Sequence, residues 1–186
     1  LLLPQGQVLK DVRLSPEICA EGMRFVAPLL ANATVAEGRF SVALNGARVP
    51  LADPPAGQFS GSMAINGQIK PGPIAQEFVG LIKEIVTLVQ QGKAPNLRAI
   101  DGALMSVDSS NVEFELANRR VYHRNLTIIV GTTPITTKGS VGFDESLALE
   151  IEVPIQAKWV GSKPALQPLI GQSIRIPVTG TFAKPN

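Results

Sequence analysis

The stretch LALEIEVPI at residues 147–155 decides the fold class of this chain. Aliphatic residues occupy nearly every second position, and Glu150 and Glu152 lie between them. Successive side chains of a β-strand point to opposite faces, so this stretch predicts a strand with one apolar and one charged face. A strand buried on both faces of a parallel sheet is apolar throughout. The alternation therefore favours an antiparallel sheet with a single covered face.

The same alternation continues on both sides of this stretch. Further alternating runs are found at residues 40–44, 59–69, 112–116, 126–130, 135–143 and 174–182. Short turn signals separate several of them, at Asn118-Arg119, residues 131–134 and residues 144–146. We therefore expect roughly nine or ten strands, with neighbours in sequence paired as a meander.

Two helices interrupt the strand pattern in the first half of the chain. Ser15-Pro16-Glu17 supplies a capping hydroxyl, a proline suited to the first helical position and an acid at the positive end of the helix dipole. A helix should begin there and run to about Ala31, with a bend or break near Pro28. A second helix is expected over residues 73–92, because its apolar residues recur with the helical period and fall on one face.

Glycines on the apolar side of the predicted strands indicate that the sheet is curved. Four glycines occupy positions of the apolar face in the alternating pattern: Gly61, Gly67, Gly139 and Gly180. Glycines inside strands commonly mark bulges and bends. The predicted fold class is α+β and mostly β: a curved antiparallel sheet with two amphipathic helices packed on its apolar face. We expect residues 1–186 to form one domain. Its apolar face is either sealed by the helices or left open as a groove, and that difference decides the function.

Composition and charge exclude several classes of protein. Of the 186 residues 45% are hydrophobic and 17% charged, which does not fit a disordered chain. The net charge of +2 is small, and no basic run is longer than Arg119-Arg120, so nucleic acid is not an expected partner. The single cysteine, Cys19, and the single histidine, His123, rule out an internal disulfide, a cysteine metal cluster and any site with two imidazoles.

One cluster of basic residues is a candidate anion-binding patch, for example for a lipid phosphate. It consists of Arg119, Arg120, His123 and Arg124. The alternative is a solvated strand at the edge of the sheet, where basic side chains discourage pairing with another sheet. We favour this alternative.

No residue pattern points to catalysis. Paired carboxylates can serve glycosidases or bind a hard cation, but Glu113/Glu115 and Glu150/Glu152 alternate with core residues and are better explained as the wet face of the sheet. Cys19 lies among apolar residues and is expected to be a buried, inert thiol. We expect no enzymatic activity, no cofactor and no metal.

Four segments and the closing stretch carry a resemblance to a known family. They are residues 112–121, 126–128, 135–144 and 147–151, followed by IPVTGTFAKP at residues 176–185. Their order is a strand, a basic turn, a strand, a Gly-x-Val-x-Phe-Asp segment and an alternating leucine strand. This order resembles the C-terminal region of AsmA-like proteins of the bacterial envelope, the AsmA/TamB-type group with a repeating β-groove. The resemblance covers mainly residues 99–186.

The resemblance implies a non-enzymatic role in lipid transport or in outer-membrane assembly and homeostasis. Members of the family are mostly periplasmic, are anchored to a membrane at the N-terminus and form a long apolar groove for lipid. The chain is then expected to be a C-terminal part of a longer envelope protein, without its anchor, whose ligand is a phospholipid or another molecule with acyl chains. The candidate lipid contacts are Phe114, Ile128, Val141, Leu149, Ile151 and Val153. The sequence identifies no protein partner.

Two other functions remain open. In the first, the helices seal the sheet and the domain is a structural or protein-interaction module without a ligand. In the second, the strands close into a barrel around one pocket, as in a lipocalin-like carrier, although the interleaved helices argue against a closed barrel.

Overall fold

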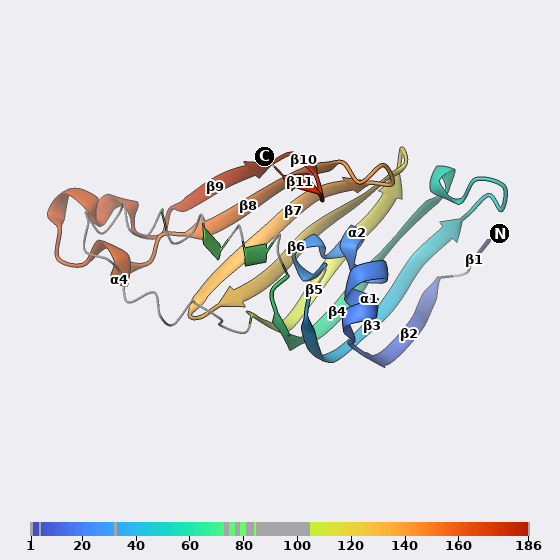
Figure 1. Cartoon of the computed structure of the whole chain (residues 1–186), viewed down its shortest axis with the longest axis horizontal. Coiled ribbons are helices and arrows are strands. Elements are labelled where there is room, and N and C mark those ends of the chain that lie inside the picture. Colours follow the sequence, from blue (N-terminus) through green and yellow to red (C-terminus); the bar gives the residue numbers. More distant parts are fainter. Residues whose placement is uncertain are drawn as a thin grey trace.

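A long antiparallel sheet forms the body of the protein (Figure 1). The computed structural model describes residues 2–3, 5–31, 33–72, 75–76, 79–80, 84 and 105–185. The large sheet has nine strands in this part of the chain: β1 (Leu2–Leu3), β2 (Gly6–Arg13), β3 (Val35–Arg48), β4 (Gln58–Lys70), β5 (Met105–Ala117), β6 (Arg120–Val130), β7 (Thr133–Gly142), β8 (Leu147–Pro154) and β9 (Ser173–Val178). A small second sheet pairs β10 (Gly180–Thr181) with β11 (Lys184–Pro185).

The predicted meander is confirmed. From β3 to β9 every strand pairs antiparallel with the next one in sequence, and β1 and β2 both pair with β3. The turn between β5 and β6 has positive φ at both central residues, Asn118 and Arg119. That backbone conformation matches the right-handed twist of the strands in a two-residue hairpin. The fold class is therefore α+β and mostly β, as the sequence predicted.

Alternation gives the large sheet one buried and one wet face. In β8, Leu147, Leu149, Ile151 and Val153 are buried, whereas the residues between them are exposed or half-buried. The buried apolar side chains of β3 to β9 join one core cluster with residues from the helical segments. We call the buried side the inner face and the other side the outer face.

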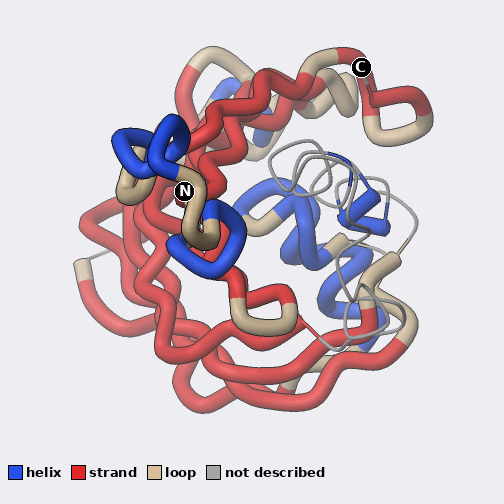
Figure 2. Tube along the Cα trace, turned by 90° about the vertical axis from the view of Figure 1, so that its left-hand side faces the viewer, coloured by secondary structure: helices blue, strands red, loops and turns tan. Residues whose placement is uncertain are grey.

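The sheet curves around the helical segments, which lie inside the arch (Figure 2). Gly61 lies in β4 where a side chain would not fit, because a Cβ at this position would lie 2.2 Å from the carbonyl oxygen of Ala43 and 2.8 Å from the ring of Phe114. Gly67 and Gly139 also lie in strands of the large sheet. Gly180 does not lie in the large sheet, which corrects the prediction that it belongs to the strand at residues 174–182. With a φ of +86° it turns the chain after β9 into the small sheet.

The first predicted helix forms, but with an irregular middle. Ser15 caps it, since its Oγ accepts a hydrogen bond from the amide of Ile18 at 3.3 Å. The helix ends at Val26, because Ala27 leaves the helical conformation and Pro28 follows it. This end is close to the predicted break. Its parts are α1 (Pro16–Ile18), the π-helical turn η1 (Cys19–Met23) and α2 (Arg24–Val26), and the short 3₁₀ turn η2 (Pro28–Leu30) follows. We call residues 16–30 the cover segment.

Most of the second predicted helix, residues 73–92, lies outside the described residues. Those that are described within it are helical, and Ala75 and Val79 are buried in the core. Between β8 and β9 the chain forms α4 (Ala157–Val160) and the 3₁₀ helix η5 (Pro164–Leu169), and another 3₁₀ turn, η3 (Pro54–Ala56), precedes β4. The alternation pattern predicted none of these three.

Candidate functional site

The six predicted lipid contacts all lie on the inner face and belong to one apolar cluster. They come from four neighbouring strands, β5 to β8. All six are buried, with exposed fractions between 0 and 7%. The structure therefore brings the predicted residues together, and the chain itself covers them.

The cavities that the described residues line differ in size between the two faces of the sheet. One cavity on the inner face has a volume of about 10 Å³, which is at the lower limit for a single water molecule. It is lined by Leu29, Ala75, Val79, Met105, Ile128, Val130, Ile135 and Ile151. A much larger hollow of about 810 Å³ lies on the outer face, among charged residues such as Arg13, Glu37 and Arg39. The cavity described on the apolar face is thus small, and the large hollow on the outer face has both polar and apolar lining residues.

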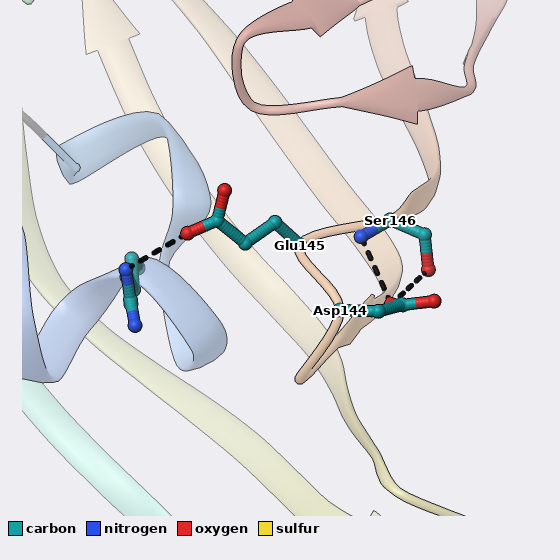
Figure 3. Close-up of polar contacts among 4 residues, drawn as sticks. Asp144, Glu145 and Ser146 are labelled. Atoms are coloured by element: carbon teal, nitrogen blue, oxygen red, sulfur yellow. Dashed lines mark hydrogen bonds and ion pairs between the residues drawn. The ribbon is translucent and has the colours of Figure 1, made fainter.

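The cover segment packs on the inner face through α2, which lies against β6 and β7. Two side-chain contacts tie α2 to the turn between β7 and β8. Arg24 Nη1 lies 3.4 Å from Glu145 Oε1, and the ring centroids of Phe25 and Phe143 are 5.0 Å apart. Figure 3 shows Glu145 reaching from this turn toward the helical ribbon. Because both charged side chains are partly exposed, this ion pair contributes at most about 1 kcal/mol.

The turn that presents Glu145 is held by its own polar network (Figure 3). The amide and the hydroxyl of Ser146 both donate to Asp144 Oδ1, at 3.1 and 2.6 Å, and these bonds hold the pKa of Asp144 below its usual value. Arg120 donates from Nη1 to Ser146 Oγ at 2.6 Å and from Nε to Ser140 Oγ at 2.9 Å. The guanidinium of Arg120 therefore has a structural role at this turn.

The four predicted anion-patch residues do not form one surface. Arg120 is engaged in the turn network, and Arg119 pairs with Asp53 from the loop before β4. His123 lies on the inner face, whereas its neighbour Arg124 is exposed on the outer face. The edge-strand interpretation is also wrong, because β6 lies between β5 and β7. The sequence did contain the signal for His123, which is two residues from the buried Val121 and therefore on the same side of the strand.

His123 is a polar group in an apolar environment. Its ring is 1% exposed and lies between Phe114 of β5 and Gly139 of β7 in the strand register. Nε2 lies 3.0 Å from Thr137 Oγ1, and Nδ1 has no hydrogen-bond partner in the described part of the chain. Burial lowers the pKa of His123 from 6.5 to about 4, so the imidazole is neutral in the folded protein near neutral pH.

This histidine predicts that mild acid destabilises the fold. Because burial lowers the pKa of His123 in the folded state and not in the unfolded state, the unfolded chain takes up a proton first as the pH falls from 6.5 to about 4. The free energy of unfolding should therefore fall by about 2 kcal/mol between about pH 7 and about pH 5. Urea titrations followed by circular dichroism measure this loss. The variant His123→Leu is the control, and an equal loss in that variant would contradict the prediction.

The carboxylate pairs lie on the outer face, where the alternation placed them. Glu113 and Glu115 line a shallow polar hollow of about 380 Å³ with Tyr122 and Arg124. Glu150 pairs with Lys138 of β7, at 2.8 Å between Nζ and Oε1. Among the described residues no group of three or more His, Cys, Asp or Glu side chains is placed to hold a metal ion.

Cys19 lies in η1 and is completely buried. Burial, with a smaller effect from the charge of Glu17, raises the pKa of the Cys19 thiol to about 11. A thiol with this pKa remains protonated near neutral pH and is a poor nucleophile. The predicted buried thiol is confirmed.

The contacts that hold the cover segment were not predictable from the sequence. Arg24 and Glu145 are 121 residues apart, and neither residue type is unusual in its local sequence.

The helices in the described part of the chain include none with the length and apolar character needed to cross a bilayer.

No known family, curated protein or solved structure matches this chain significantly. The resemblance to AsmA-like proteins therefore stays a prediction.

Proposed function

We propose that this chain is a non-enzymatic domain of the bacterial cell envelope that takes up the acyl chains of lipids on its inner face, in lipid transport or outer-membrane assembly. One observation carries the proposal. Apart from a few buried polar residues such as His123 and Thr137, the inner face is apolar from Phe40 in β3 to Val178 in β9. In the described part of the chain it is covered by short helical segments and not by a second sheet. The order of strands and turns in residues 112–151, which resembles that of AsmA-like proteins, supports the envelope location.

Lipid uptake in this proposal requires the cover segment to move. The six candidate contacts are at most 7% exposed, so an acyl chain reaches them only when the helical residues above them are displaced. Opening the face to water exposes apolar surface and is costly, but an acyl chain replaces one apolar partner with another. The two side-chain contacts of α2, Arg24 with Glu145 and Phe25 with Phe143, are the described contacts that displacement would break first, since they lie at its attachment to the turn.

The proposal predicts that weakening this attachment increases lipid affinity. An ion pair and an aromatic pair together contribute roughly 1.4 kcal/mol, so the open fraction should rise about tenfold in the variant Phe25→Ala/Glu145→Gln. The apparent Kd for parinaric acid, a fluorescent fatty acid, should fall by the same factor. Native mass spectrometry and organic extraction of the purified protein should show co-purifying phospholipid.

Asp53→Asn provides the matched control for this experiment. It removes a partly exposed ion pair, Arg119 with Asp53, that does not involve the cover segment. Parinaric acid affinity should be unchanged in this variant. A clean apo mass together with no parinaric acid binding to any of the three proteins would reject lipid handling.

The alternative function is a structural or protein-interaction module with a sealed core. The cavity of about 10 Å³ and the complete burial of Ile128, Val141 and Val153 favour it. Exposed aliphatic side chains gather on the edge formed by β1 and β2, namely Leu2, Leu3, Val8 and Leu9. The apo outcome of the lipid experiments would support this alternative.

A further inference from the structure

We propose that protonation of His123 releases the cover segment from the inner face, so that the domain opens in mild acid. This device concerns the motion of the protein itself and holds whether or not a lipid occupies the opened face.

His123 lies on β6, one of the two strands against which α2 of the cover segment packs. α2 packs on β6 and β7, and its attachment at Phe143 and Glu145 lies just beyond the end of β7. The inner-face pairs of these two strands nearest to this attachment are Val121 with Val141 and His123 with Gly139. Because Gly139 has no side chain, it cannot cover the imidazole from β7. The ring is nevertheless 1% exposed, so residues packed above the sheet shield it from water.

Protonation would leave the ring with a charge that no neighbour among the described residues compensates. In neutral histidine one ring nitrogen is an acceptor, and in the imidazolium both nitrogens donate. Nε2 already interacts with Thr137, but Nδ1 has no partner in the described residues. The inner-face residues of the adjacent strands carry no charge: Val112, Phe114 and Leu116 on β5, and Ile135, Thr137 and Val141 on β7.

The cover segment supplies no negative charge to the ring either. Its ionisable residues are Glu17, Cys19, Glu21 and Arg24. Glu17 and Glu21 are exposed to water, the Cys19 thiol is neutral, and Arg24 is itself positive. Glu145, on the turn below α2, pairs with Arg24. Burial lowers the pKa of His123, and no charge among the described residues contributes to this shift. An imidazolium at this position gains solvation only if water reaches Nδ1.

The cover segment yields to water more easily than the sheet does. β6 is held by ladders of hydrogen bonds to β5 and β7 on its two sides. The cover segment consists of single helical turns with a π-helical turn in the middle, and such turns often occur where a helix must adapt or move. Arg24 Nε is buried without a hydrogen-bond partner among the described residues, so this attachment is not fully satisfied. Local opening draws on elements of this low stability.

The protein contains its own reporter of this opening. Cys19, the sole cysteine, lies in the middle of the cover segment and is 0% exposed. Dithiodipyridine reacts with thiols even in acid. The labelling rate of Cys19 is divided at each pH by the rate for free cysteine, which removes the pH dependence of the reagent itself. If His123 has its ordinary pKa of 6.5 in the open state and about 4 in the closed state, this corrected rate should rise roughly twentyfold from about pH 7 to about pH 5. The far-UV circular dichroism of the sheet should stay unchanged over this range.

Three variants test whether His123 is the cause. In the variants His123→Leu and His123→Gln, the corrected labelling rate of Cys19 should be the same at both pH values. The double variant Tyr122→His/His123→Leu moves the single imidazole to the exposed neighbouring position on the outer face, and its labelling should be equally flat. If a folded variant without a histidine at position 123 shows the same rise in Cys19 labelling as the wild-type protein, the proposal is overturned.

The wild-type protein gives a test that needs no variant. Because His123 is the only histidine, one imidazole signal in the proton NMR spectrum reports its titration. This titration and the rise in Cys19 labelling should share one midpoint. Separate midpoints, no rise in labelling, or a rise that accompanies loss of the sheet signal would each overturn the proposal. Since none of these measurements uses lipid, failure of lipid binding and failure of the acid opening are distinguished.

Discussion

Ile151→Asp is expected to unfold the domain. Ile151 is 1% exposed and lies in the middle of β8, paired with Thr137 of β7 and Ile176 of β9. Truncation of such a side chain costs about 2–5 kcal/mol, and a carboxylate without a partner in an apolar core adds several more. The loss is comparable to the whole stability of a typical domain, about 5–15 kcal/mol. Urea unfolding followed by circular dichroism should show little or no folded protein.

Ala148→Asp is the matched control, because it places the same charge on the exposed side of the same strand. Its free energy of unfolding should stay within about 0.5 kcal/mol of the wild-type value. If Ile151→Asp folds with comparable stability, the inner face of β8 is not part of the core. The result also bears on lipid binding: a charged residue at Leu149 or Ile151 removes the fold together with any groove, so lipid lost in such variants does not demonstrate a lipid site.

Gly139→Ala is expected to lower the free energy of unfolding by about 3 kcal/mol or more, through a clash of backbone atoms. A Cβ at Gly139 would lie 2.2 Å from the carbonyl oxygen of Ala148 and 2.7 Å from the Cα of Leu149 on the adjacent strand. The φ of +137° is also a conformation that residues with a side chain rarely adopt. Neither the strand of Gly139 nor its neighbour can move without breaking the ladder between β7 and β8.

Gly131→Ala separates the two causes. Gly131 has a φ of +63° in the turn after β6, and a Cβ there would have no neighbour within 4 Å. This substitution therefore carries the cost of the left-handed backbone alone, roughly 1–2 kcal/mol. Equal losses in the two variants, measured by urea unfolding, would show that the close approach of β7 and β8 does not restrict residue 139.

The features that the sequence predicted correctly are local ones. Alternation at residues 147–153 identified both the strand and its buried face, and Ser15 with Pro16 identified the start of a helix. These signals depend on residues a few positions apart, whose geometry is fixed by the strand or the helix itself. The buried histidine follows from the same rule. The basic residues of 119–124 suggested one charged surface, whereas the period of the strand divides them between two faces.

The features that it could not predict depend on distant parts of the chain. The ion pair of Arg24 with Glu145 exists because the sheet carries its far strands to the end of α2. The closure of the inner face likewise depends on how the helical segments fit the arch, and alternation alone is compatible with a sealed face or an open one. For this reason the sequence left the choice between lipid handling and a sealed module open.

The meander topology also affects how the chain reaches its fold. From β5 to β8 each strand is joined to the next by a short turn, so these pairings form between residues that are never far apart in the chain. The pairing of Ile69 with Met105 is different, because residues 71–104 separate β4 from β5. Closing that interval loses more chain entropy than any pairing of adjacent strands from β5 to β9. We therefore expect the halves of the arch to meet late, after the C-terminal hairpins have formed, because local contacts form before distant ones.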